Sequence, residues 1–258
     1  MLEIPNKLYS KTQKMVEILN LYTQGKVYKG FCPICESNTK FIEKDAWLRE
    51  YYYCSKCHSN PRQRELVIAL NLFFPDWRNL KIHESSPGGA SSEYLQKSCS
   101  RYLASQFYYN VELGQYKDGV RCENLEKMTF ENCSFDLIIT QDVFEHIMHP
   151  DAAFNEISRV LKPGGAHIFT IPWYPKLSRT AQRARLNNGK IEFLDEPVYH
   201  GNPIDAKGSL VTFDWGLDLT DFISKHSELF TTIYLCKDRK FGLDGEQLEV
   251  FISRKTAA

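Results

Sequence analysis

Residues 134–172 read SFDLIITQDVFEHIMHPDAAFNEISRVLKPGGAHIFTIP. The apolar run 135–140 is too short for a helix and predicts a buried strand. A helix begins at Pro150 or Asp151, because apolar residues then recur at three- and four-residue spacing. It ends at residues 162–165, Lys-Pro-Gly-Gly, since proline cannot continue a helix and glycine accepts positive φ. Residues 166–171 predict a second buried strand. A strand, a crossover helix and a strand form a βαβ unit, which builds a parallel sheet.

The same stretch resembles one region of class I S-adenosylmethionine-dependent methyltransferases, between their fourth and fifth strands. The resemblance is carried by Glu145-His146 after the first strand and by Arg-Val-Leu-Lys-Pro-Gly-Gly at residues 159–165. It implies an α/β, Rossmann-like sheet of seven mainly parallel strands, in which one antiparallel strand is inserted beside the fifth. Two β-rich runs at 229–236 and 247–254 fit this ending. A dinucleotide dehydrogenase would instead end its sheet with a parallel strand.

The amino-acid composition limits the classes of protein to which this chain could belong. The 258 residues are 43% hydrophobic and 25% charged, as in an ordinary folded domain. The 32 basic and 32 acidic residues cancel, so no overall field attracts nucleic acid or an anionic membrane. No apolar run reaches the length of a membrane span, and the first twenty residues lack the pattern of a signal peptide. We therefore expect a cytoplasmic protein without a membrane or nucleic-acid partner.

Two Cys-x-x-Cys pairs, separated by eighteen residues, predict a metal site. This is the ligand spacing of structural zinc, because each pair turns two thiolates toward one tetrahedral ion. The expected ligands are Cys32, Cys35, Cys54 and Cys57. The aromatic, charged segment between the pairs is too small for a core of its own, and bound zinc would replace that core. Two redox pairs are the alternative.

A helix begins directly after the second pair. Asn60 is its expected N-cap, Pro61 its first residue and Gln63 the partner that completes a capping box. A zinc-knuckle segment followed by this helix resembles the front end of a bacterial methyltransferase group. We expect a docking helix within residues 1–27, a zinc-binding segment at 28–60 and a methyltransferase domain at 61–258, with a lid or substrate insertion at 172–216.

The resemblance also predicts where S-adenosylmethionine binds. After the first strand, the family has an acid followed by glycines at every second position, where the backbone passes close to the cofactor. Glu84 matches the acid and Gly88 the middle glycine, whereas Ser86 and Ala90 replace the outer two. A plain turn is the alternative.

The ends of three further strands complete this predicted site. The second strand ends at Ser105-Gln106, where Rossmann-type sites usually carry an acid for the ribose. The resemblance places Glu123, Asn124 and Leu125 at the adenine, although a solvated loop charge is the alternative for Glu123. The expected cofactor-binding residues are Glu84, Ser86, Gly88, Gly89, Ser105, Gln106, Glu123, Asn124, Leu125, Gln141 and Asp142.

The acceptor is expected beneath the insertion, which follows the fifth strand and so lies over the catalytic edge. Trp173, Tyr199 and Asn202 are its expected substrate-binding residues. His200 is the leading general-base candidate, because a neutral imidazole takes up a proton near pH 7. His146 is a second catalytic candidate, with a packing role as the alternative.

The sequence thus predicts methyl transfer from S-adenosylmethionine to an oxygen or nitrogen of a small-molecule or saccharide acceptor. Three alternatives stay open. A degenerate methyltransferase fold would serve as a zinc-containing binding module, an interpretation that Ser86, Ala90 and Gln106 favour. An RNA-modifying methyltransferase would bind RNA through Arg62, Arg64 and the tyrosines of the zinc segment. A nicotinamide enzyme would need an acid at the ribose position, which Gln106 does not provide.

Overall fold

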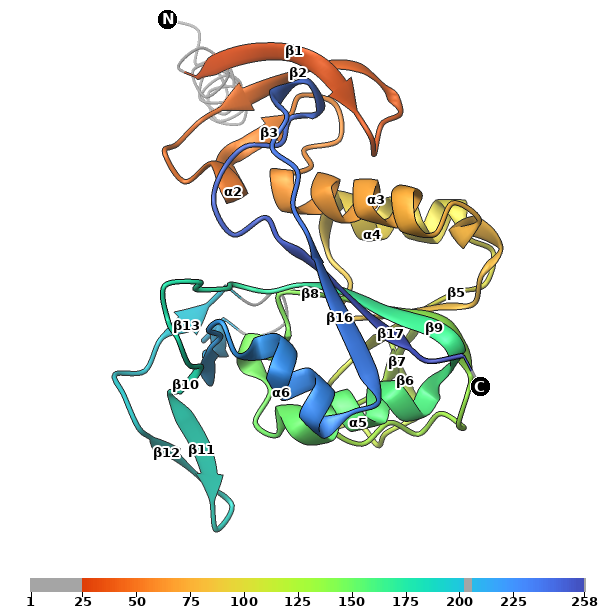
Figure 1. Cartoon of the computed structure of the whole chain (residues 1–258), viewed down its shortest axis with the longest axis vertical. Coiled ribbons are helices and arrows are strands. Elements are labelled where there is room, and N and C mark those ends of the chain that lie inside the picture. The colour runs from red at the N-terminus through yellow and green to blue at the C-terminus, as the bar shows by residue number, and fades with distance from the viewer. Residues whose placement is uncertain (1–24, 202–205, 258) are drawn as a thin grey trace, which may run out of the picture.

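A central sheet lies between two pairs of helices, with a small sheet at one side and short hairpins at the other (Figure 1). This computed structural model describes residues 25–201 and 206–257. The helix expected within residues 1–27 lies almost entirely outside the described residues. No helix within them has the length and hydrophobicity to cross a bilayer.

The central sheet has the strand order β16-β17-β9-β8-β4-β5-β7-β6. Its strands are β4 (Ile82–Ser85), β5 (Tyr102–Gln106), β6 (Tyr116–Lys117), β7 (Val120–Cys122), β8 (Phe135–Gln141), β9 (Leu161–Thr170), β16 (Leu229–Tyr234) and β17 (Val250–Lys255). Strand β4 pairs in parallel with β5 and β8, β8 with β9, and β5 with β7. Strand β17 is antiparallel to both β9 and β16. This confirms the expected fold, with an antiparallel strand inserted beside the fifth; the short edge strand β6 was not expected.

The Lys-Pro-Gly-Gly segment differs from expectation in one respect. Strand β9 begins at Leu161, directly after the helix, and not at Ala166. Phe135 pairs with Leu161 and Leu137 with Ala166, so residues 162–165 bulge out opposite Asp136. Gly164 has φ 79°, a left-handed conformation that glycine adopts readily. Residues 162–165, which were predicted to form a turn, therefore form a bulge at the start of β9.

Alternate residues of the sheet pack against opposite helix layers, as the period of a strand requires. Helices α3 (Pro61–Phe73) and α4 (Gly89–Ser98) lie on one face, and α5 (Pro150–Val160) and α6 (Leu219–His226) on the other (Figure 1). Ile139 belongs to the core cluster of α3 and α4, whereas Ile138 belongs to that of α5 and α6. Both faces are covered, which explains the continuous apolar run of β8.

The segment expected to bind zinc is a three-stranded antiparallel sheet of β1 (Lys26–Cys32), β2 (Ser37–Glu43) and β3 (Tyr52–Cys54), with a short helix α2 (Leu48–Tyr51) before β3. Helix α3 joins it to the central sheet. The predicted capping box is present, since Gln63 N donates to Asn60 Oδ1 at 3.0 Å and Asn60 N donates to Gln63 Oε1 at 3.3 Å. Arg64 is fully buried, and its Nη2 donates to the carbonyl oxygens of Tyr52 at 2.7 Å and Gly242 at 2.6 Å. It thereby ties the segment to the loop between β16 and β17, which contains the turn η3 (Arg239–Phe241).

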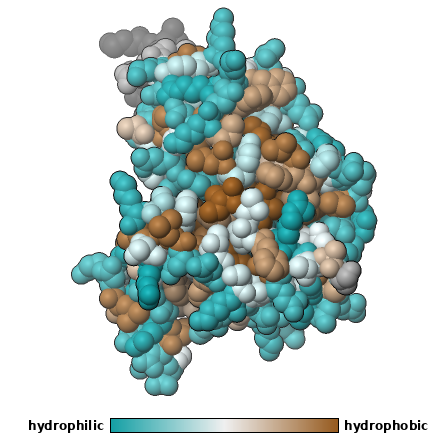
Figure 2. All heavy atoms as spheres, in the orientation of Figure 1, coloured by the Kyte–Doolittle hydropathy of each residue, from teal (hydrophilic) through white to brown (hydrophobic). Residues whose placement is uncertain are grey.

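The described residues of the insertion after β9 form three short antiparallel strand pairs. Strand β10 (Ala181–Gln182) pairs with β15 (Phe213–Asp214), β11 (Ala184–Asn187) with β12 (Lys190–Phe193), and β13 (Tyr199–His200) with β14 (Ser209–Leu210). The hairpin β11–β12 projects from the body (Figure 1). On the face where β16 runs, hydrophobic side chains cross the middle of the molecule (Figure 2), and β16 exposes Phe230 and Ile233.

Two buried histidines lie on the α5 side of the sheet. His83 of β4 shares a hydrogen bond of 2.8 Å with Ser105 Oγ, and His167 of β9 one of 2.9 Å with Thr140 Oγ1. Burial lowers the pKa of each imidazole to about 3. Below pH 6.5 the unfolded chain therefore binds protons that the folded chain does not, and the free energy of unfolding falls as the pH decreases.

We predict that His83→Gln weakens this acid sensitivity. Between pH 7.5 and pH 5, the wild-type protein should lose about 2 kcal/mol more of its unfolding free energy than the variant does. Urea unfolding at both pH values measures the difference. The control, His149→Gln, changes an exposed histidine and should retain the wild-type loss. An equal loss in His83→Gln would show that His83 is protonated in the folded protein.

Candidate functional site

The loop after β4 has the backbone that the predicted cofactor site requires. Ser86 has φ 57° and Gly89 φ 73°, both in the left-handed region. A Cβ atom placed on Gly88 would meet no atom within 4 Å, so open space lies beside this backbone. Helix α4 begins at Gly89, and the first amides of a helix have no partner within it. The loop therefore fits the close approach of a ligand.

Glu84 lies beneath this loop, with no exposure to solvent. Ser92 Oγ donates to its Oε1 at 2.7 Å, Gln141 Nε2 to the same oxygen at 2.8 Å, and Tyr102 OH to its Oε2 at 2.6 Å. Burial raises the pKa of Glu84, against the effect of these three donors. In this structure Glu84 of β4 thus connects to β5 through Tyr102, to β8 through Gln141 and to helix α4 through Ser92.

The remaining predicted cofactor residues divide into buried and accessible groups. Ser105, Glu123 and Leu125 are buried. Glu123 accepts from Arg121 Nε at 2.7 Å and from the Thr129 amide at 2.8 Å, so its carboxylate holds the loop after β7. Gln106 and Asn124, at the ends of β5 and β7, are half-buried. Among the predicted residues at the ends of β5 and β7, the accessible ones are thus these two carboxamides.

Asp142 follows β8 and meets two arginines from the N-terminal part of the chain. Its Oδ1 lies 2.8 Å from Arg49 Nη2 and its Oδ2 lies 3.2 Å from Arg62 Nε. Burial by itself would raise the pKa of Asp142, but the Arg62 and Arg49 guanidinium groups hold it below its usual range. Asp142 also has φ 51°, so two left-handed non-glycine residues, Ser86 and Asp142, end neighbouring strands. Such backbone conformations cluster at functional sites.

Glu145 and the two predicted catalytic histidines converge beside Asp142. Glu145 and His146 lie in the short turn η2 (Phe144–His146), and His200 lies in β13. Glu145 Oε1 is 3.6 Å from His146 Nε2 and 3.6 Å from His200 Nδ1. The rings of His146 and His200 meet edge to face, with centroids 5.2 Å apart. The structure therefore brings both histidines together, 54 positions apart in the sequence, around a carboxylate that sequence reasoning did not select.

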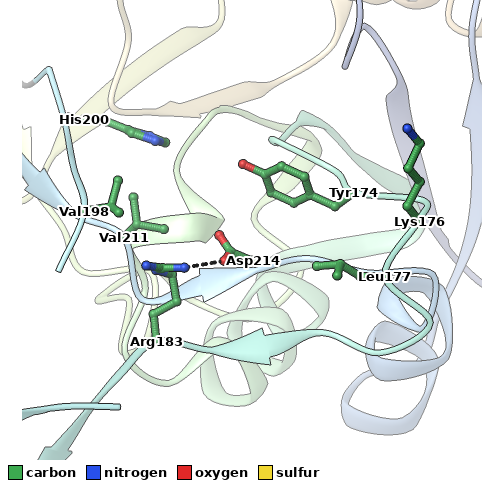
Figure 3. Close-up of a pocket in the computed structure, with 8 residues that line it drawn as sticks. All are labelled: Tyr174, Lys176, Leu177, Arg183, Val198, His200, Val211 and Asp214. Atoms are coloured by element: carbon green, nitrogen blue, oxygen red, sulfur yellow. Dashed lines mark hydrogen bonds and ion pairs between the residues drawn. The ribbon is translucent and has the colours of Figure 1, made fainter. Parts of the chain in front are cut away.

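A cavity of about 340 Å³ opens beside His200 (Figure 3). Its lining residues are Tyr174, Lys176, Leu177, Arg183, Val198, His200, Val211 and Asp214. The side chains of His200 and Tyr174 point toward one another across it, and Arg183 Nη1 donates to Asp214 Oδ2 at 2.7 Å (Figure 3). Apart from His200, none of these residues was predicted. The only feature of the sequence that could have indicated the other lining residues is that they lie in the insertion after β9.

The predicted substrate residues occupy three different settings. Trp173 is half-buried, and its Nε1 donates to Gly216 O at 2.7 Å, so its indole anchors the insertion. Tyr199 is 50% exposed and precedes His200 in β13. Asn202 lies outside the described residues. Of Trp173 and Tyr199, Tyr199 is the more exposed.

The four knuckle cysteines also converge. Their sulfur atoms all lie within 4.8 Å of one another, with Cys32 to Cys57 at 3.8 Å and Cys35 to Cys54 at 3.7 Å. Four thiolates bound at about 2.3 Å from a tetrahedral ion lie about 3.8 Å apart. The Cys35 and Lys56 amides point to the sulfurs of Cys32 and Cys54, at 3.5 and 3.4 Å. The cluster fits a closed zinc site without an open position.

The chain was compared with known protein families and solved structures. Residues 86–169 match a family model described as "Methyltransferase domain". The structure is similar to an S-adenosylmethionine-dependent methyltransferase from Mesorhizobium loti, with 16% identity and a TM-score of 0.49 over 74% of this chain and 98% of that chain. A methyltransferase from Methanosarcina mazei has 14% identity and a TM-score of 0.41 over 70% of this chain and 94% of its own.

A further similar structure is 1,6-didemethyltoxoflavin-N1-methyltransferase from Burkholderia thailandensis, solved with 1,6-didemethyltoxoflavin and S-adenosylhomocysteine bound. It has 12% identity and a TM-score of 0.44 over 99% of this chain and 92% of that chain. No curated protein matches the chain significantly. The assignment of the fold rests on the strand order and on the match to the family model.

We predict that the Arg49–Asp142 pair is a large contributor to stability. The side chain of Arg49 is 4% exposed, and removal of one partner of a buried ion pair typically costs about 3 to 5 kcal/mol. Arg49→Met should therefore lower the free energy of unfolding by about that amount in urea titrations. The control, Arg185→Met, breaks an exposed pair with Glu192 and should leave the free energy of unfolding nearly unchanged. Equal effects in the two variants would contradict the prediction.

Proposed function

Because residues 86–169 match the methyltransferase domain family and the sheet has the class I strand order, we propose that the protein transfers a methyl group from S-adenosylmethionine to an oxygen or nitrogen nucleophile. The observation that carries the proposal is the open backbone at Gly88, between the left-handed Ser86 and Gly89, at the carboxyl end of β4. Ligands of open α/β sheets bind at this edge.

We assign the accessible polar residues of this edge to the cofactor. Gly88 and Gly89 would lie against its methionine part, Gln106 beside the ribose and Asn124 beside the adenine. Glu84 and Glu123 support these contacts from below, because their oxygens already accept hydrogen bonds from the chain. S-adenosylmethionine supplies a methyl group on a positively charged sulfur, which is ready for in-line displacement.

The acceptor would occupy the cavity beside His200. Small molecules and saccharides fit a space of about 340 Å³ lined by Tyr174, Lys176 and the Arg183–Asp214 pair. In the transfer, the S–CH₃ bond breaks as the bond from the acceptor atom to that carbon forms, and the electron pair stays on sulfur. The acceptor's proton leaves at the Glu145–His146–His200 cluster. The main tasks of the chain are alignment and proton removal.

Gly88→Phe tests the cofactor site. Gly88 has φ −165°, which any residue adopts, and the open space beside it accommodates a side chain. The variant should therefore melt at the wild-type temperature but bind S-adenosylmethionine and S-adenosylhomocysteine at least tenfold more weakly in calorimetric titrations. Gly88→Ala is the matched control, with a smaller loss expected. A folded wild-type protein that binds neither ligand would overturn the proposal and favour a zinc-containing binding module.

We also propose that Cys32, Cys35, Cys54 and Cys57 bind structural zinc. Cys54→Ser should lower the zinc content of the purified protein below one equivalent and lower its melting temperature, because the metal replaces a hydrophobic core in this segment. Cys133→Ser changes an exposed cysteine outside the cluster and should alter neither value. Elemental analysis and thermal melts measure both. Full zinc content in Cys54→Ser would reject the assignment.

An RNA substrate is the second candidate. Lys29, Lys40 and Lys56 line a hollow of about 710 Å³ on the zinc-binding segment, a local basic surface in a chain of zero net charge. Arg64 does not contribute, since it is fully buried. If RNA binds there, Lys40→Glu should weaken the binding of a labelled single-stranded RNA and reduce its salt dependence. Absence of salt-sensitive RNA binding by the wild-type protein would remove this candidate.

A further inference from the structure

Three side chains of metal-ligating type meet at one point next to the acceptor cavity. Glu145 Oε1, His146 Nε2 and His200 Nδ1 face one another, and all three atoms lie within 4.8 Å. Two histidines and one carboxylate form a recurrent ligand set for divalent first-row metals. Ligand atoms about 2.1 Å from an ion lie about 3.0 to 3.4 Å apart, so the two distances of 3.6 Å need only a small contraction.

The Glu145 carboxylate is buried and accepts no hydrogen bond from the described residues. Its residue is 1% exposed, and within the described part of the chain neither oxygen accepts a hydrogen bond. A buried carboxylate without hydrogen bonds or a counter-charge is costly, and native structures pair such groups or place them on metals. A cation between Glu145 and the two histidines, which lie 3.6 Å away, would satisfy this carboxylate.

His146 is oriented so that its free nitrogen faces this carboxylate. Its Nδ1 lies 2.8 Å from the carbonyl oxygen of Leu210. A carbonyl only accepts, so Nδ1 carries the hydrogen and the lone pair of Nε2 points to Glu145. Two acceptors then face each other at 3.6 Å, and a cation satisfies both. Metal-binding histidines typically donate their other ring hydrogen to a backbone carbonyl or carboxylate in this way.

We propose that Glu145, His146 and His200 bind one divalent transition-metal ion, separate from the four-cysteine site. His200 also lines the acceptor cavity, so the open coordination positions face the acceptor. An acceptor oxygen, such as a hydroxyl or carboxylate, would complete the shell, and this role in catalysis rests on the proposed methyl transfer. With a metal bound, the His200 lone pair would be a ligand and would not accept the proton. The ion would then lower the pKa of the acceptor hydroxyl, and the proton of that hydroxyl would leave to solvent before the oxygen attacks the methyl carbon.

Cobalt binding tests this site without cofactor or acceptor. The full-length protein is first loaded with one equivalent of Zn²⁺, which the thiolates prefer, and then titrated with Co²⁺ by calorimetry and visible absorption. The wild-type protein should bind one Co²⁺ without the intense thiolate-to-cobalt band in the near ultraviolet. That band would appear if Co²⁺ replaced zinc at the cysteines, and its appearance with no further equivalent bound would overturn the proposal.

Variants of the ligands identify the site. His200→Asn and Glu145→Gln should each weaken Co²⁺ binding at least tenfold, while His149→Asn, an exposed histidine outside the cluster, should bind as the wild type does. His200 has a side chain that is 39% exposed, so its variant should fold even if Glu145→Gln does not, and melting curves check both. Unchanged affinity in a folded His200→Asn protein would overturn the proposal. Because no methyl donor is present, this failure is distinct from a failure to bind S-adenosylmethionine.

Discussion

The ion pairs of Asp142 with Arg49 and Arg62 set the geometry of the whole candidate site. A carboxylate at the end of a central strand faces the ligand edge of the sheet, and here it is bound by two guanidinium groups from the N-terminal part of the chain. Arg49 also donates from Nε to the carbonyl of Gln247 at 2.8 Å, so a third segment, the loop before β17, meets at the same point. These charges are largely buried, and loss of one partner would leave the others unpaired.

Helix α3 makes this arrangement possible. One side of it packs into the core of the central sheet through Leu66 and Leu70, while Val67 belongs to the core of the zinc-binding segment. Arg62 lies in the first turn of the same helix and reaches Asp142. The position of the small sheet is therefore coupled to the edge where the cofactor is proposed to bind. A metal ion bound by the four cysteines would stabilise the small sheet, and helix α3 would transmit this effect to the edge because its Arg62 contacts Asp142.

The acids of the fold have two different tasks. Glu84 and Glu123 are buried with their oxygens satisfied by neighbouring donors, so they keep the loops after β4 and β7 in shape. Glu145 is equally buried, but its oxygens accept no hydrogen bond from the described residues, and it lies 3.6 Å from both His146 and His200. Burial alone does not separate these roles. The number of hydrogen bonds that each carboxylate accepts distinguishes Glu84 and Glu123 from Glu145.

The sequence by itself determined the βαβ unit around residues 134–172, the capping box of α3, the inserted antiparallel strand and the pairing of the two cysteine knuckles. These features depend on local periodicity, on turn residues, or on ligand spacing that neighbouring residues carry. Only the tertiary structure decided that Arg49 reaches Asp142, and that His200 joins Glu145 and His146. The reason is that these contacts join segments whose separation along the chain says nothing about their distance in space. The insertion shows the same limit, because its short strands have no periodicity long enough to be recognised before they pair.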